Sequence, residues 1–226
     1  MNVVLLHAFP LDERMWEPQL AVLASHDVTA PNLYDLGGSS VDGWAEQILD
    51  QVEDDLVAVG ASMGGYVALA MARRAPERIR GLLLAGSRPD ADSPERRAGR
   101  AGTISLIEEA GAEGLWENQR EKLFAGEPSG PAREMALDRD AEELVRGVEA
   151  LRDRADSSGI LAALQVPVVF GLGAGDLFFS VEEAGAFAKQ APLGRLVVFE
   201  RSRHLPNLEQ PAEFNQTLLE LLASAG

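Results

Sequence analysis

The chain has 226 residues, of which 46% are hydrophobic, so it can form one substantial core and is too apolar to be disordered throughout. Its 36 acidic and 20 basic side chains give a formal net charge of −16, which argues against binding to nucleic acids or anionic membranes. Cysteine is absent, only three histidines occur and no apolar run has the roughly 20 residues of a membrane span, so we expect a cytoplasmic protein without a metal site.

The first 87 residues alternate between short apolar runs and helical segments. This alternation predicts an α/β architecture, with a mostly parallel sheet and helices on both of its faces. Ser40 is placed to cap the helix that begins at Val41. The first residues of the sequence lack the basic and apolar regions that are typical of a signal peptide. The expected strands span residues 3–6, 28–30, 56–59 and 79–85, and the expected helices span 14–23, 41–53 and 66–74.

The character of the chain then changes. Residues 88–158 are charged and helical in pattern and contain no convincing strand, so we expect a helical cap inserted into a core formed by residues 1–87 and 159–226. The expected breaks within the cap lie at Gly111, Gly114 and 126–131. Beyond the cap the sheet pattern resumes, with strands at 166–172 and 196–199 and helices at 160–164, 181–190 and 212–223.

The stretch Gly60-Ala61-Ser62-Met63-Gly64-Gly65 fits the pattern Gly-x-Ser-x-Gly. The pattern alone is weak, but an apolar strand precedes it and a helix rich in Ala and Leu follows it. Strand, sharp turn and helix form the context of a nucleophile elbow, in which the serine hydroxyl is exposed on a strained turn. The N-terminus of the following helix adds positive potential where negative charge would develop. Ser62 is therefore the candidate nucleophile.

A candidate base and acid follow the last two expected strands. Asp176 comes after the strand at 166–172, and His204 comes after the strand at 196–199. Parallel strands present their carboxyl ends at one edge of the sheet, so Ser62, Asp176 and His204 are expected to converge. His204 would take the serine proton and Asp176 would orient the imidazole. Two alternatives remain: Asp176 could instead cap the next helix, and Asp90 or Asp92 could supply the acid.

An oxyanion intermediate needs two preorganised donors. The backbone N–H groups of Met63, at the start of the elbow helix, and of Phe9, in the loop after the first strand, are the candidates. We expect His7 to hydrogen-bond within its loop and His26 to lie at the surface. In the cap, Leu115, Trp116 and Phe124 could line a pocket, although apolar residues at helical spacing more often pack within the cap.

Three segments, 6–12, 60–65 and 204–211, together resemble α/β-hydrolase fold carboxylesterases, and most closely the small branch named for 3-oxoadipate enol-lactonase. The resemblance covers essentially the whole chain. It implies an α/β-hydrolase fold and a serine hydrolase of small carboxylic esters or lactones that works through an acyl-enzyme without a cofactor. Serine at position 62 disfavours the dehalogenases and epoxide hydrolases, whose nucleophile is aspartate, and both tyrosines, Tyr34 and Tyr66, lie outside the cap.

The chain departs from that family at two points. Ala8 stands where the family commonly has glycine, so the oxyanion loop could differ slightly. The leading strands that such proteins usually carry are missing, so one sheet edge could be exposed or could pair with a second copy to form a homodimer.

The substrate is less well specified than the chemistry. An enol-lactonase proper, an acyltransferase or perhydrolase, and a non-catalytic small-molecule receptor are the alternatives on the same fold. Eleven of the 20 basic residues lie between Arg88 and Arg154, most of them near acidic residues, which is typical of a solvated helical face. Because no cap arginine is marked as pointing inward, we expect neutral short or medium acyl esters to be preferred over lactones that carry a carboxylate.

Overall fold

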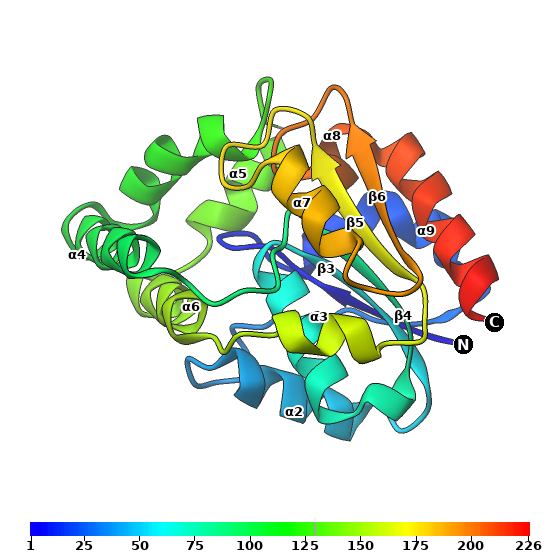
Figure 1. Ribbon diagram of the computed structural model, residues 1–226. Coiled ribbons are helices and arrows are strands. Elements are labelled where there is room, and N and C mark those ends of the chain that lie inside the picture. The colour runs from blue at the N-terminus through cyan, green and yellow to red at the C-terminus, as the bar shows by residue number, and fades with distance from the viewer. Residues whose placement is uncertain (129) are drawn as a thin grey trace.

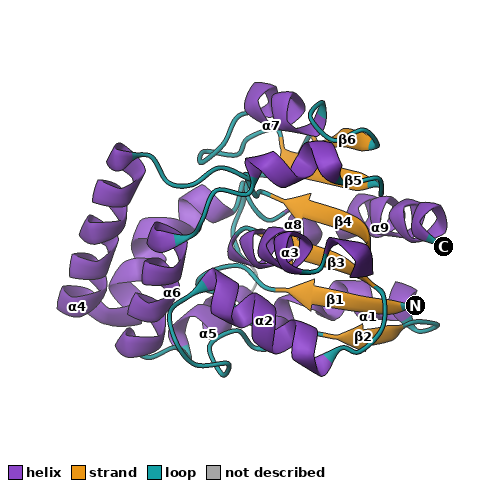
Figure 2. Ribbon diagram, turned by 60° about the horizontal axis from the view of Figure 1, so that its bottom comes forward, coloured by secondary structure: helices purple, strands orange, loops and turns teal. Residues whose placement is uncertain are grey.

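The computed structural model describes residues 1–128 and 130–226. Its six strands form one sheet in the order β2-β1-β3-β4-β5-β6, and every neighbouring pair is parallel. Figure 2 shows the strand arrows pointing the same way, so their carboxyl ends share one edge. The strands are β1 (Asn2–Leu6), β2 (Asp27–Thr29), β3 (Leu56–Ala61), β4 (Ile79–Ala85), β5 (Val168–Gly173) and β6 (Gly194–Phe199). The parallel α/β sheet is thus confirmed.

Helices cover both faces of this sheet. Side chains alternate between faces along a strand, so Val4 and Leu6 of β1 pack into one core and Val3 and Leu5 into the other. Burial on both sides explains why the strands are continuous apolar runs. On one face lie α2 (Val41–Gln51), α3 (Met63–Arg74) and α7 (Val181–Ala188), and on the other lie α1 (Glu17–Leu20), α8 (Pro206–Glu209) and α9 (Pro211–Ala225) (Figures 1 and 2).

A helical segment, residues 94–153, lies beyond the carboxyl ends of the strands (Figure 1). It contains α4 (Pro94–Leu123), α5 (Gly130–Leu137) and α6 (Ala141–Asp153). The expected break at Gly111 is confirmed, because this glycine has φ 62° and ψ −160° and divides α4 into two arms. The break expected at Gly114 is wrong, since Gly114 continues the second arm. Part of the break expected at 126–131 falls on residue 129, which is outside the described residues. That the segment acts as a separate cap domain stays a prediction.

Several element ends differ from expectation for local reasons. The helix expected at 14–23 is divided into η1 (Glu13–Trp16), α1 and η2 (Ala21–Leu23). Pro18 has no backbone N–H to donate to a preceding carbonyl, so a continuous helix would lack a hydrogen bond there. The helix expected at 160–164 is the 3₁₀ helix η4 (Ser158–Ala163), and a second short 3₁₀ turn, η3 (Pro76–Arg78), precedes β4. The short helix α8 was not expected. Ser40 caps α2 as expected, accepting a hydrogen bond from the N–H of Gly43.

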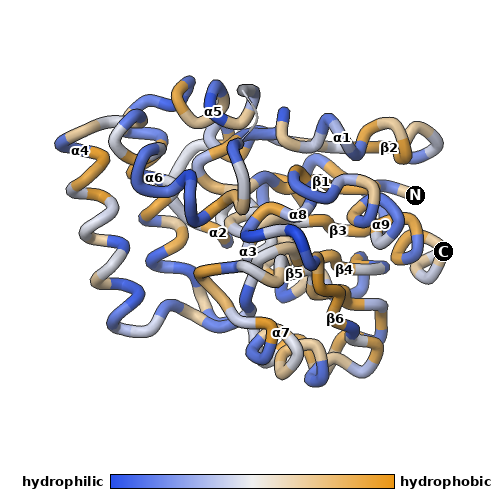
Figure 3. Tube along the Cα trace, turned by 90° about the horizontal axis from the view of Figure 1, so that it is seen from above, coloured by the Kyte–Doolittle hydropathy of each residue, from blue (hydrophilic) through white to orange (hydrophobic). Residues whose placement is uncertain are grey.

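Hydrophobic residues concentrate in the sheet, whereas α4 and α6 mix hydrophobic and hydrophilic positions along their length (Figure 3). In the described part of the chain, no helix is long and apolar enough to cross a membrane. The sheet has two edge strands, β2 with three residues and β6 with six. Pairing of an edge with a second copy of the chain stays a prediction.

Candidate active site

Ser62 lies at the turn between β3 and α3 with φ 48° and ψ −109°. It is the only residue other than glycine with a positive φ in the described ranges, so the turn is strained there. The turn also passes close to other backbone: a Cβ at Gly64 would overlap the carbonyl of Leu6. Glycine at that position lets the elbow lie against β1, and the turn presents the Ser62 side chain at the carboxyl edge of the sheet.

The structure joins the three predicted side chains in one hydrogen-bonded chain. His204 Nε2 lies 2.8 Å from Ser62 Oγ, and His204 Nδ1 lies 2.7 Å from Asp176 Oδ2. The Asp176 side chain is fully buried and that of His204 is 5% exposed, so water hardly screens their interaction. Phe178 packs on the imidazole with ring centroids 4.5 Å apart. The geometry gives Ser62 a hydrogen-bonded base and gives that base an acidic partner.

The alternatives for Asp176 are not supported. Asp90 pairs with Arg88 and Arg96, and Asp92 pairs with arginines as well, so neither carboxylate reaches His204. Asp176 does not cap the next helix, because Ser180 caps α7 through the N–H of Glu183. The second oxygen of Asp176 instead accepts the N–H of Phe178 at 2.8 Å, which fixes the carboxylate for its bond to His204.

The two candidate oxyanion donors lie in loops that flank Ser62. Met63 is the first residue of α3, where a helix leaves its N–H groups without intrahelical acceptors. Phe9 lies in the loop after β1 and lines the same cavity as Ser62. Within the described residues, neither backbone N–H has a protein acceptor. Both groups are therefore free to bind a ligand oxygen.

A cavity of about 370 Å³ opens beside Ser62 and His204, between the sheet edge and the helical segment. One wall is apolar, with Phe9, Leu123, Leu151, Leu177 and Phe178. Both arms of α4 face it: the first arm at positions 96, 99, 100 and 103, and the second at 119, 122 and 123. These spacings of three and four residues mark one face of each arm.

The structure bears on two points about the cap: whether any arginine faces the cavity, and whether three apolar residues line it or pack. Arginines do point inward, because Arg88, Arg96 and Arg100 line the cavity together with Lys122. Leu115, Trp116 and Phe124 are buried in hydrophobic packing and none contributes to the cavity wall, which agrees with the more usual role of apolar residues at helical spacing. Sequence reasoning missed the cationic wall, and the only available signal was the helical spacing of Arg96 and Arg100 with Asp92.

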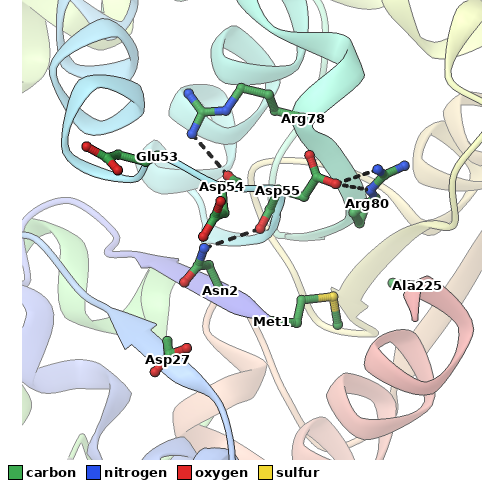
Figure 4. Close-up of a pocket in the computed structure, with 9 residues that line it drawn as sticks. All are labelled: Met1, Asn2, Asp27, Glu53, Asp54, Asp55, Arg78, Arg80 and Ala225. Atoms are coloured by element: carbon green, nitrogen blue, oxygen red, sulfur yellow. Dashed lines mark hydrogen bonds and ion pairs between the residues drawn. The ribbon is translucent and has the colours of Figure 1, made fainter.

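A wider hollow of about 610 Å³ lies at the opposite, amino-terminal edge of the sheet (Figure 4). Arg80 pairs with the carboxylate of Asp55, and Arg78 donates to the backbone carbonyl of Asp54. Among the described residues no serine or histidine lines it, so it cannot form a serine–histidine pair. Asp54 and Asp55 are exposed to solvent where the chain enters β3. The candidate site is therefore the smaller cavity.

His7 has a structural position. Its Nε2 accepts the N–H of Leu33 at 2.8 Å, and its Nδ1 donates to the carbonyl of Ala8 at 3.2 Å, so both nitrogens of a neutral ring are used. Full burial lowers the pKa of His7 from 6.5 to about 4, mainly because the charged ring would lose its hydration. The expectation of a hydrogen-bonding role is confirmed. His26 is half-buried and not at the open surface as expected.

We expect His7 to make stability dependent on pH. The unfolded ring titrates near 6.5 and the folded ring near 4, so between these values the unfolded chain binds more protons and stability falls as the pH falls. The loss should total about 3 kcal/mol on going from pH 7 to pH 4. Urea unfolding at several pH values should show this slope in the native chain and a smaller slope in His7→Gln, whose amide oxygen can accept the Leu33 N–H. Equal slopes in both proteins would contradict the assignment.

No group of three or more His, Cys, Asp or Glu side chains in residues 1–128 and 130–226 is arranged to hold a metal ion.

Comparison with known proteins gives a consistent result. The chain matches the model of the Alpha/beta hydrolase family over residues 3–217. It is 27% identical to a pimeloyl-[acyl-carrier protein] methyl ester esterase of Aromatoleum aromaticum, with 94% of each chain covered, and 27% identical to one of Klebsiella pneumoniae, covering 100% of this chain and 95% of the relative.

Solved structures are similar over the same length. A thermophilic esterase from Thermogutta terrifontis, determined with malate bound, superposes with a TM-score of 0.91 at 29% identity, covering 100% of this chain and 90% of the esterase. The enol-lactonase of Burkholderia xenovorans superposes with a TM-score of 0.86 at 24% identity, covering 98% and 91%. The second likeness is evidence for the fold alone.

Proposed function

Because the chain belongs to the alpha/beta hydrolase family and is a carboxylic ester hydrolase, we propose that it cleaves small carboxylic esters or lactones through an acyl-enzyme formed on Ser62. The observation that carries the proposal is the hydrogen-bonded chain from Asp176 through His204 to Ser62 at the wall of the cavity. A serine hydroxyl is a weak nucleophile at neutral pH, and an adjacent base is the usual means of activating it.

In the first step Ser62 Oγ attacks the ester carbonyl while His204 Nε2 takes the hydroxyl proton. The tetrahedral intermediate collapses, the bond to the alcohol oxygen breaks, and His204 returns the proton to that oxygen. Water then attacks the acyl-enzyme with His204 again as base, which releases the acid and restores Ser62. In a lactone the alcohol stays attached to the acid, so a single hydroxy acid is released.

Asp176 would act through His204. Its bond to Nδ1 fixes the tautomer whose Nε2 can accept the serine proton, and its charge stabilises the imidazolium that forms. The negative oxygen of the intermediate would be bound by the N–H groups of Met63 and Phe9. Free donors at the start of α3, where the helix dipole adds positive potential, support this assignment.

The names of the two sequence relatives make methyl esters of medium-chain acids the first substrates to test. The direct experiment combines labelling by a fluorophosphonate with a hydrolysis screen of methyl esters, p-nitrophenyl esters of increasing acyl length, and several lactones. We expect the probe to label Ser62 and at least one ester class to be hydrolysed. A folded protein that is not labelled at Ser62 and hydrolyses none of them would favour a binding protein of the same fold. Acyl transfer to an added alcohol or to peroxide should be measured in the same reactions.

Replacement of Asp176 by asparagine should leave more activity than loss of Ser62 or His204. Asparagine keeps the size of the side chain, but its amide favours the wrong tautomer of His204, so we expect kcat to fall by about 10⁴-fold. Steady-state kinetics with one good ester measure this effect, and Asp90→Asn serves as control because Asp90 pairs only with arginines. Full activity in Asp176→Asn would move the acid elsewhere.

A further inference from the structure

The cavity beside Ser62 carries a charge opposite to that of the whole protein. The chain has a formal net charge of −16, whereas four Lys and Arg side chains and one carboxylate line this cavity. The cations are Arg88, Arg96, Arg100 and Lys122, and the carboxylate is Asp92. Behind the lining, Asp90 and Glu183 pair with the arginines, and Arg154 pairs with Asp92. An excess of positive charge is thus concentrated beside the proposed nucleophile of an acidic protein.

Three arginines beside the cavity, Arg88, Arg96 and Arg154, each donate at least two hydrogen bonds to the protein. Arg88 holds Asp90 through two nitrogens, and Arg96 donates to Asp90 and to the carbonyl of Ala91. Arg154 is buried and donates to Asp92 and to two backbone carbonyls. These pairs hold the helical segment in place and occupy more of each guanidinium than the single hydrogen bond that Arg100 makes.

Arg100 and Lys122 differ from the others. Arg100 uses only its Nε, at 3.0 Å from Asp92 Oδ2, and among the described residues its two terminal nitrogens have no protein partner. Its side chain is 26% exposed and lines the cavity. Lys122, from the second arm of α4, donates to the amide oxygen of Asn118 and pairs with no carboxylate in the described part of the chain. The two cations lie on opposite arms of the bent helix and face one cavity.

We propose that Arg100 and Lys122 bind a free carboxylate carried by the ester substrate, so that the enzyme prefers anionic esters to neutral ones. The proposal rests on the proposed function, because it places a specificity site in the cavity that Ser62 shares. The free edge of the Arg100 guanidinium offers the two parallel donors that a carboxylate accepts, and Lys122 adds a second charge. Apolar walls at Leu123 and Leu151 leave room for a short alkyl chain between the two ends of the substrate.

The expectation of a preference for neutral esters is thereby reversed. That expectation followed from the overall charge, which repels anions at long range. Salt screens such a field over about 10 Å at 0.1 M ionic strength, whereas a carboxylate in contact with Arg100 in a partly enclosed cavity is screened much less. Local contacts therefore decide which ester is held, and the net charge only slows its capture.

The test compares two matched pairs of esters. Monomethyl adipate and methyl hexanoate differ by a carboxylate on the acid part, and 6-acetoxyhexanoate and hexyl acetate differ by a carboxylate on the alcohol part. We expect at least one anionic ester to exceed its neutral partner in kcat/KM by about tenfold or more, as one charge-assisted contact allows. The pair that shows the preference identifies the part of the ester that carries the carboxylate.

Arg100→Gln, Lys122→Gln and the double variant should lower the ratio of anionic to neutral kcat/KM, with the loss mainly in KM, because the carboxylate is remote from the reacting bond. Arg97→Gln is the matched control: Arg97 is also on the first arm of α4 and also pairs with one aspartate, but it points away from the cavity, so it should leave the ratio unchanged. Raising the salt concentration should reduce the preference of the native enzyme.

Equal or better turnover of both neutral esters would overturn the proposal, and so would a preference that survives the double variant. These outcomes differ from a failure of the proposed function. In that case no ester would be hydrolysed, or Ser62→Ala would remain active. An enzyme that hydrolyses neutral esters through Ser62 without preferring carboxylates would retain the proposed function and lose only this inference.

Discussion

Ser62→Ala is expected to lower kcat by about 10⁶-fold, more than the loss expected for Asp176→Asn, because the variant has no oxygen with which to form the acyl-enzyme. Residual turnover would come from the oxyanion donors and from binding, which the substitution leaves in place. The measurement is the steady-state rate with the best ester found, combined with loss of fluorophosphonate labelling. Far-ultraviolet circular dichroism checks that the fold persists.

His204→Ala should cost about as much as Ser62→Ala, and the double variant should cost little more than either, since the residues act as one unit. Ser105→Ala is the matched control: this serine is exposed on α4 and does not line the cavity. It should leave kcat and KM unchanged. A double variant far slower than both single variants would show that Ser62 and His204 contribute independently and would contradict the shared mechanism.

Asp92→Ala should cause the largest loss of stability among the substitutions considered. The Asp92 side chain is fully buried, and it accepts from Arg154 at 2.7 Å, whose own side chain is 2% exposed. Removing the carboxylate leaves a buried guanidinium without its counter-charge, which costs about 3–5 kcal/mol. For a chain of this size that corresponds to a fall in Tm of roughly 10 °C. Thermal and urea unfolding measure the effect.

Two further variants separate burial from charge. Asp153→Ala removes an aspartate that pairs with Arg97 but is 45% exposed, so it should cost about 1 kcal/mol or less. The double replacement Asp92→Leu with Arg154→Met removes both buried charges and should be less destabilising than Asp92→Ala alone. A loss in Asp92→Ala no larger than that in Asp153→Ala would show that the Asp92–Arg154 pair contributes little to holding the helical segment.

Much of the site could be predicted from the sequence because the parallel topology of the sheet brings the residues that follow its strands to the same edge. Once β3, β5 and β6 are recognised as parallel strands of one sheet, the residues that follow them must lie at one edge, and Ser62, Asp176 and His204 follow those strands. Their separation along the chain is then of little consequence. The helix ends were predicted where caps are local, as at Ser40.

The orientation of the cationic side chains could not be predicted, for a physical reason. Arginines at helical spacing from aspartates look alike in sequence whether their pairs face water or a cavity. Which face of α4 turns inward depends on the bend at Gly111 and on the packing of α4 against α6, both of which are tertiary features. Arg97 and Arg100, three positions apart, are equivalent in pattern and have opposite exposures to the cavity.

The two ends of the inserted helical segment lie close together. The N–H of Ser157 donates to the carbonyl of Pro89 at 2.8 Å, so the chain leaves the sheet after β4 and returns before β5 at nearly the same point. Of the cationic residues that line the cavity, Arg96, Arg100 and Lys122 lie between these ends and Arg88 lies one residue before them, whereas Ser62, Asp176 and His204 lie well outside them. A single genetic exchange with crossovers near positions 89 and 157 would therefore replace the charged wall as one contiguous block. Related enzymes that share the same catalytic residues can evolve different substrate specificities by this route, because recombination at these positions exchanges the substrate-binding wall and leaves the catalytic residues unchanged.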